Sequence, residues 1–176
     1  IPIVSFNMDG LVKNPGFRLA RRMLRRIIMA GFYGDALMRV SHRLTPYEIN
    51  KGDVDALVRV WVERIKVHLR TAGFFRYHRN MAQLVRDFDD LPIRTEERKP
   101  RVGLVGEILL KYHPDANNGA VKIVEAEGGE AVVPDLMDFV LYSFHDSIYR
   151  YRHLSGPWRN YATSLMSIAF FEQCRR

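Results

Sequence analysis

Five residues between positions 106 and 118 are of types suited to binding a ligand: Gly106, Glu107, Tyr112, Asn117 and Asn118. A glycine lets the backbone approach a ligand closely, and a carboxylate can accept hydrogen bonds or a proton. The two asparagines can donate to a carbonyl or phosphate oxygen, or they can cap the start of a helix. The stretch therefore predicts a place for ligand binding and leaves the reaction open.

The elements around this stretch should form a βαβ unit. Residues 102–106 predict a parallel strand buried on both faces, and residues 131–133 predict a second short strand. Between them, Ala120, Val121 and Val124 share one face of a predicted helix. Because ligands of such folds lie beyond the carboxyl ends of the strands, we expect the chemistry in the loop 106–118.

Other motifs that would define the chemistry are missing from the sequence. It has neither the three-glycine dinucleotide fingerprint nor a phosphate loop ending in Gly-Lys-Ser/Thr. His113 and His145 could act as acid, base or ligand near neutral pH, but the six histidines lack the spacing of a metal site. A metal site is therefore not predicted, and the basis for any catalysis by this chain alone stays open.

The single cysteine, Cys174, rules out a disulfide within the chain and cannot by itself hold an iron–sulfur cluster. We interpret it as a buried or terminal bystander in a reducing, cytoplasmic protein. No apolar run approaches the roughly 20 residues of a membrane-spanning helix, so no membrane contact is expected.

A basic helix is predicted near the start of the chain, with Asn14 as its cap and Pro15 in its first turn. Its polar face carries five arginines: Arg18, Arg21, Arg22, Arg25 and Arg26. They form either a solvated face or a docking surface for an acidic partner or a phosphate. The stretch from Gly31 to Asp35 is expected to break or bend this helix, and a shorter continuation is expected to end before Pro46.

The predicted architecture is α/β, with a small Rossmann-like parallel sheet and an α-helical insertion. A third strand at residues 3–6 opens the chain, and we interpret the whole as an excised part of a larger protein with exposed sheet edges. The predicted divisions are an entering strand and turn at 1–13, a helical region at 14–90, an exposed linker at 91–100, the βαβ unit with a helix packed on its sheet at 101–153, and a C-terminal helix at 154–176. Within the helical region we expect helices at 54–69, with an apolar stripe that includes Val54, Trp61 and Ile65, and at 74–88. Within the last division the helix is expected to begin at Tyr161.

The net charge of +7 is concentrated in residues 1–100, where 19 Lys and Arg stand against 11 Asp and Glu. Basic charge alone indicates association with anions and does not define a fold. Because no aromatic-interleaved motif, zinc-ligand spacing or helix-turn-helix pattern accompanies it, nucleic acid is not the expected partner.

Several stretches resemble proteins related to acyl-CoA dehydratase activases, also described as CoA-substrate-specific enzyme activases or activators of (R)-2-hydroxyglutaryl-CoA dehydratase. The stretches are SFNMDGLVKNPGF, YGDALMRV, TPYEINKGDVD and, the most specific, VGLVGEILLKYHPDANNGAVKIVEAEGGEAVVPDLMDFVLY. The resemblance covers residues 1 to about 145 and is to the regions of that family that look like dehydratase subunits, not to its ATPase modules.

The resemblance implies a role in ATP-driven delivery of low-potential electrons through iron–sulfur clusters, for reactions of 2-hydroxyacyl-CoA thioesters. ATP and the cluster would belong to the parent system and not to this chain. The chain would scaffold an interface with other parent segments or dehydratase subunits, or contribute to a CoA-thioester site, without catalysing a reaction alone. Two alternatives stay open: a module that binds CoA or nucleotide phosphates, and a structural interaction domain.

Overall fold

A computed structural model describes residues 20–71, 74–94 and 98–175. The expected strand at 3–6, the helix start at Asn14 and Pro15, and Arg18 lie outside these residues. The described elements are α1 (Arg21–Leu44), the 3₁₀ turn η1 (Thr45–Tyr47), α2 (Asp53–Thr71), α3 (Phe74–Asp89), β1 (Arg101–Gly103), α4 (Ile108–Tyr112), α5 (Ala120–Ala126), β2 (Glu130–Val132), α6 (Leu136–His153) and α7 (Trp158–Arg175).

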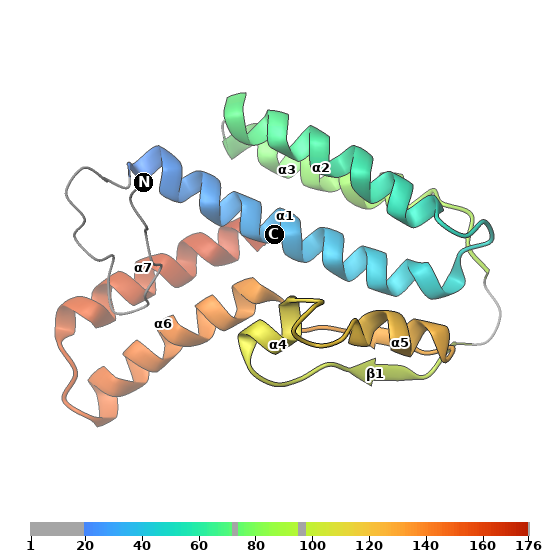
Figure 1. Ribbon diagram of the computed structural model, residues 1–176. Coiled ribbons are helices and arrows are strands. Elements are labelled where there is room, and N and C mark those ends of the chain that lie inside the picture. The colour runs from blue at the N-terminus through green and yellow to red at the C-terminus, as the bar shows by residue number, and fades with distance from the viewer. Residues whose placement is uncertain (1–19, 72–73, 95–97, 176) are drawn as a thin grey trace, which may run out of the picture.

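Helix α1 is the central element of the molecule. Figure 1 shows the α2–α3 hairpin along one side of it, and the α6–α7 hairpin and the small βαβ unit along the other. The described part of the chain is thus mostly helical, with one two-stranded parallel sheet. The helices predicted at 54–69 and 74–88 are confirmed, whereas α7 begins at Trp158, three residues before the predicted start.

The predicted break between Gly31 and Asp35 is wrong, because α1 continues through both residues. A glycine inside a helix costs only about 1 kcal/mol, and the buried stripe of Met29, Tyr33 and Leu37 runs across this point. Gly31 also receives the side chain of Met137, whose Cε would lie 2.5 Å from a Cβ at that position. The helix ends at Leu44, in agreement with the stop expected before Pro46.

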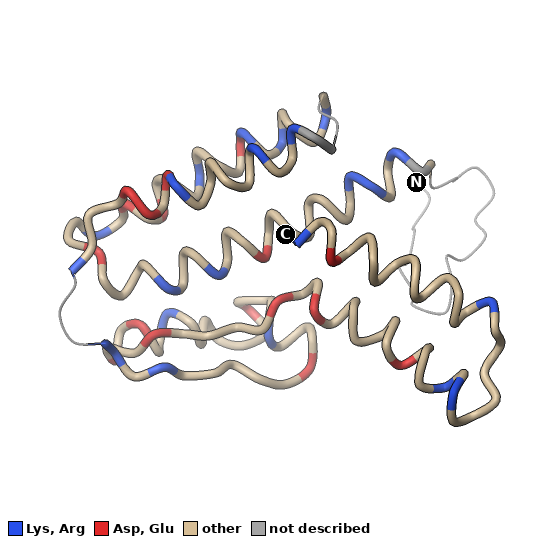
Figure 2. Tube along the Cα trace, turned by 180° about the vertical axis from the view of Figure 1, so that it is seen from behind, with Lys and Arg blue, Asp and Glu red and all other residues tan. Residues whose placement is uncertain are grey.

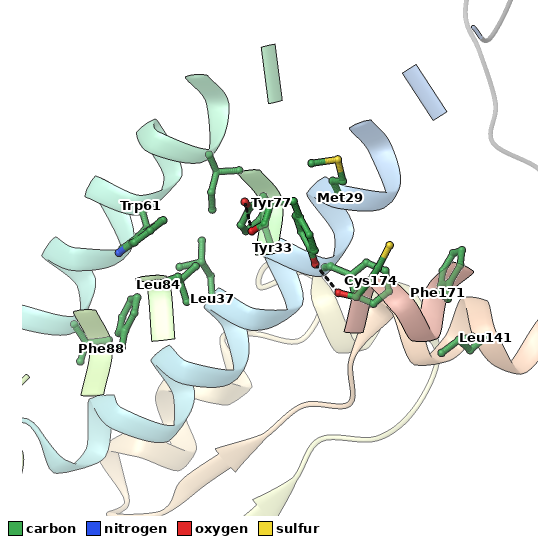
Figure 3. Packing of buried hydrophobic residues seen from close by; sticks show 13 residues of the cluster. Met29, Tyr33, Leu37, Trp61, Tyr77, Leu84, Phe88, Leu141, Phe171 and Cys174 are labelled. Atoms are coloured by element: carbon green, nitrogen blue, oxygen red, sulfur yellow. Dashed lines mark hydrogen bonds between the residues drawn. The ribbon is translucent and has the colours of Figure 1, made fainter. Parts of the chain in front are cut away.

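The core lies where α1 meets the two hairpins, as Figure 3 shows. A buried polar contact links the first three helices: Tyr33 Oη lies 2.8 Å from His68 Nδ1 and donates to the carbonyl of Tyr77 at 3.4 Å. Burial raises the pKa of Tyr33 to about 12, so its hydroxyl stays protonated and can donate. Cys174 is buried, as expected, and its carbonyl accepts a hydrogen bond from Tyr77 Oη.

The βαβ order is confirmed in its smallest form. β1 pairs in parallel with β2, with Arg101 opposite Glu130 and Gly103 opposite Val132. The prediction that β1 is buried on both faces is wrong, because all three of its residues are exposed. Branched side chains such as Val102 suit any pleated surface, so their presence did not report how much of the sheet is covered.

One further expectation about packing needs correction. The helix predicted to lie on the sheet, α6, instead packs against α7 and α1, because its apolar residues meet other helices. The linker at 91–100 is exposed at Pro92, Arg94, Arg98 and Pro100, as expected, and its backbone is also held against η1. Arg94 N–H donates to the Tyr47 carbonyl and Lys99 N–H to Tyr47 Oη. Across the described ranges, none of the helices combines the length and apolar character needed to cross a bilayer.

Candidate functional site

The five residues proposed from the sequence do not converge on one cavity. Glu107 accepts a hydrogen bond from the backbone N–H of Leu109 and so caps α4. Asn117 donates to the Leu110 carbonyl at 2.8 Å and accepts from the N–H of Ala120, the first residue of α5, whose N-cap residue is Gly119. Gly106, with φ of 132°, and Asn118, with φ of 55°, shape the turns on either side. These contacts give the loop a structural role.

Tyr112 differs from the other four because it reaches toward another part of the molecule. Its hydroxyl donates to the Pro134 carbonyl at 2.6 Å. Burial raises the pKa of Tyr112, and the nearby carboxylates Asp35, Asp135 and Asp138 raise it further. Tyr112 therefore fixes the backbone where β2 leads into α6.

A groove of about 750 Å³ runs between the C-terminal half of α1, the segment that precedes β1, and β2. We call it the α1–β2 groove. Its lining consists of Arg39, His42, Arg43, Leu44, Tyr47, Ile93, Arg94, Arg98, Lys99, Arg101, Glu130, Ala131, Val132, Val133, Pro134, Asp135 and Asp138. Figure 2 shows Lys and Arg positions on α1 and at the start of β1. The volume falls within the range of small-molecule sites, about 300–1,000 Å³.

Six cationic side chains and three carboxylates line the groove, an excess of three positive charges. Each carboxylate already has a cation: Asp135 pairs with Arg39, and Glu130 pairs with Arg101 at 3.1 Å. The third, Asp138, pairs with Arg175 on α7, which is not a lining residue. The groove is therefore more positive than the count alone indicates.

Within the described residues, Arg43, Arg94 and Arg98 have no carboxylate partner, and Lys99 lies over the Tyr47 ring at 5.9 Å. Arginine presents a planar fork of donors that matches phosphate and carboxylate oxygens. Like charges held at one groove without counter-charges repel each other, so the arrangement favours an anion. An arrangement of this kind suits a polyanionic small molecule.

Two buried polar atoms of groove-lining residues have no hydrogen-bond partner among the described residues. They are His42 Nδ1 and Asp135 Oδ1. Buried polar atoms in native proteins are nearly always paired, so an orphan atom at a groove calls for a bound water or ligand. The neutral imidazole of His42 and the carboxylate oxygen of Asp135 would form hydrogen bonds with hydroxyl or amide groups of a ligand. The neighbouring arginines would bind its phosphates.

Asp35 on α1 fixes the start of α6, directly after the groove residue Asp135. Its carboxylate accepts the backbone N–H groups of Leu136 at 2.9 Å and Met137 at 2.8 Å, the first two residues of α6. Burial raises the pKa of Asp35, and the two hydrogen bonds oppose that shift. By capping α6, Asp35 also places the preceding residue, Asp135, in the groove.

The state of His42 gives a pH-dependent prediction. Burial lowers the pKa of His42, so the unfolded chain binds a proton more readily than the folded one. Its contribution to stability is complete above the ordinary histidine pKa of about 6.5 and is lost as pH falls through the lower folded value. In urea unfolding at a series of pH values, we expect His42→Gln to lose less stability than the unsubstituted chain on acidification. If the free energy of unfolding fell equally with decreasing pH in both proteins, the role of His42 would be contradicted.

The remaining sequence candidates lie elsewhere. Arg22, Arg25 and Arg26 are exposed on α1, whereas Arg21 lies in α1 with a side chain outside the described set. His113 and His145 are exposed. In the ranges that the structure describes, no three His, Cys, Asp or Glu side chains gather as a metal site.

Sequence reasoning missed the groove. The signal available was the spacing of Arg39, His42 and Arg43, which are three and four residues apart and so share one helix face. A second signal was the run of basic residues before β1, but such a composition is equally typical of an exposed linker. A search with this chain finds no matching family model, curated protein or solved structure.

Proposed function

We propose that the α1–β2 groove binds the phosphates of coenzyme A or of a related nucleotide. The observation that carries this proposal is the set of arginines, Arg43, Arg94 and Arg98, that line one groove without carboxylate partners in the described part of the chain. Diphosphates present several negative oxygens over a short length, which suits separate guanidinium groups. This is the alternative of a CoA or nucleotide-phosphate module, placed away from the loop 106–118.

The larger setting of this proposal comes from the family resemblance. We propose that the chain supplies a CoA-thioester or partner-binding part of an activase and dehydratase-like system in the cytoplasm, without catalysing the reaction alone. ATP and an iron–sulfur cluster would belong to the parent system, and the dehydratase subunits or other parent segments would be its partners. The groove supports this setting because CoA carries the phosphates that the arginines would recognise.

The Rossmann-like sheet expected from the sequence also stays a proposal. Its support is the exposure of apolar side chains on the βαβ unit, namely Val102, Val105, Leu109, Leu110 and Ile123. Contiguous exposed apolar surface commonly marks a contact with further protein. Added strands or helices at this surface would turn the two-stranded unit into a larger sheet of the doubly wound kind.

Isothermal titration calorimetry with CoA, ADP and pantetheine tests the groove. CoA and ADP should bind, and pantetheine, which lacks phosphate, should bind at least about tenfold more weakly. Hydrogen bonds to charged groups contribute about 1.5–3 kcal/mol each, and solvent screening reduces this at a groove. Arg43→Gln with Arg94→Gln should therefore raise the dissociation constant for ADP by about tenfold or more.

The matched control is Arg59→Gln with Arg86→Gln, which removes two exposed arginines that do not line the groove. This control should leave the dissociation constant for ADP within about twofold of the value for the unsubstituted chain. It changes the net charge by the same amount, but at positions that do not line the groove. Equal losses in both double variants, or pantetheine binding as tightly as CoA, would refute a phosphate site in the groove.

A further inference from the structure

A second concentration of positive charge lies at the other end of α1. It is formed by Arg22, Arg25 and Arg26 on α1, Arg70 on α2, and Arg76 and Arg79 on α3, which we call the basic end. All six side chains are exposed, and none forms an ion pair within the described ranges. Arg26 donates to the Arg70 carbonyl at 2.8 Å, which joins α1 to α2 there. In Figure 2, Lys and Arg gather at the ends of these helices toward the N label.

Within the described residues, the charges of the basic end repel one another. The amino end of a helix carries partial positive charge, and neither α1 nor α3 has an acidic residue in its first turn. Arg22 and Arg26 are four residues apart, and Arg76 and Arg79 are three apart, so like charges face each other on each helix. A face that is only solvated gains nothing from this repulsion, whereas an anionic partner would relieve it.

Apolar side chains are mixed with these arginines. Met23, Leu24 and Ile27 are exposed on α1, and Val67 is exposed one turn before Arg70 on α2. Interfaces between proteins combine apolar contacts with arginine and methionine, whereas interfaces with nucleic acids are more polar. A groove between α2 and α3 is lined by two aromatic residues, Trp61 and His68, and both are buried, so neither can stack on a nucleic-acid base.

We propose that the basic end docks an acidic, partly apolar surface of a partner protein. Carboxylates of the partner would meet the arginines, and an apolar stripe would cover Met23, Leu24 and Ile27. The six arginines belong to three different helices, so the partner would span the ends of α1, α2 and α3. This surface is separate from the α1–β2 groove and does not depend on the function proposed for it.

The test compares three probes by fluorescence anisotropy: an amphipathic helical peptide of Leu and Glu about 20 residues long, polyglutamate of equal length, and a duplex DNA of about 20 base pairs. The peptide should bind most tightly, because only it satisfies both charge and apolar surface. Tighter binding of the duplex would replace the proposal with a nucleic-acid surface. Equal binding of peptide and polyglutamate would remove the apolar part of the proposal and so overturn it.

Arg76→Glu with Arg79→Glu should weaken peptide binding by about tenfold or more. The matched control, Arg59→Glu with Arg86→Glu, carries the same change in net charge on α2 and α3 and should change binding by less than about twofold. The reversal should also raise the melting midpoint slightly, because glutamate near the start of α3 suits the helix dipole. Unchanged peptide binding after the reversal, or equal losses in both double variants, would overturn the proposal.

Discussion

Replacing Asp35 with alanine is expected to lower the free energy of unfolding by about 2–3 kcal/mol. The substitution removes the acceptor of two backbone N–H groups, those of Leu136 and Met137, at the start of α6. Loss of a helix cap costs about 0.5–2 kcal/mol, and unpaired buried donors add to this cost. The desolvation of the Asp35 carboxylate, which raises its pKa, partly offsets the loss because alanine does not bear it.

Urea unfolding at about pH 7 measures this effect, with Asp146→Ala as its control. Asp146 is an aspartate whose side chain forms an ion pair with Arg150, and this pair is exposed on the surface of α6. Exposed pairs contribute about 0–1 kcal/mol, so the control should stay within about 0.5 kcal/mol of the unsubstituted chain. A loss for Asp35→Ala no larger than that of the control would contradict the capping role.

Leu84→Ala should lower the free energy of unfolding by about 3–5 kcal/mol, the largest loss that we expect from a single substitution. Leu84 is fully buried on α3, within the cluster that joins this helix to α1 and α2. Truncation would remove its apolar contacts and leave a cavity in closely packed surroundings. Figure 3 shows Leu84 among the side chains of this cluster, near Trp61 and Leu37.

The neighbouring residue provides the control for this prediction. Val85 comes directly after Leu84 on the same helix but is 43% exposed, so Val85→Ala leaves little cavity. Alanine also has the higher helix propensity, and the expected change is within about 0.5 kcal/mol. Denaturant titrations of both variants should separate clearly, and similar midpoints would show that α3 does not pack against α1 and α2 through Leu84.

Local patterns were enough to predict most helices. The stripe of Val54, Trp61 and Ile65 gave α2 its buried face, and these residues are buried in the structure. Local signals at Gly31 failed because the side chain that fills the space over this glycine, Met137, lies far along the sequence. Likewise, nothing local to Val102 reports whether another layer covers β1, since burial of a strand depends on what packs against it.

The candidate site was harder to predict for the same reason. Sequence reasoning placed ligand binding beyond the first strand, where the fold rule for parallel sheets directs it. The groove instead lies along β2 and meets α1, which joins Arg43 to Arg94 and Arg98 across about 50 positions of sequence. Pairing of carboxylates with particular arginines decides which charges stay uncompensated, and only the tertiary structure shows those pairs.

A crystal structure of the chain grown with ADP tests the central claim most directly, because it locates the phosphates. We predict that phosphate oxygens lie about 3 Å from guanidinium nitrogens of Arg43, Arg94 or Arg98 in the α1–β2 groove. ADP bound instead beside Glu107 and Asn117, or at the basic end, would contradict a phosphate site in the groove.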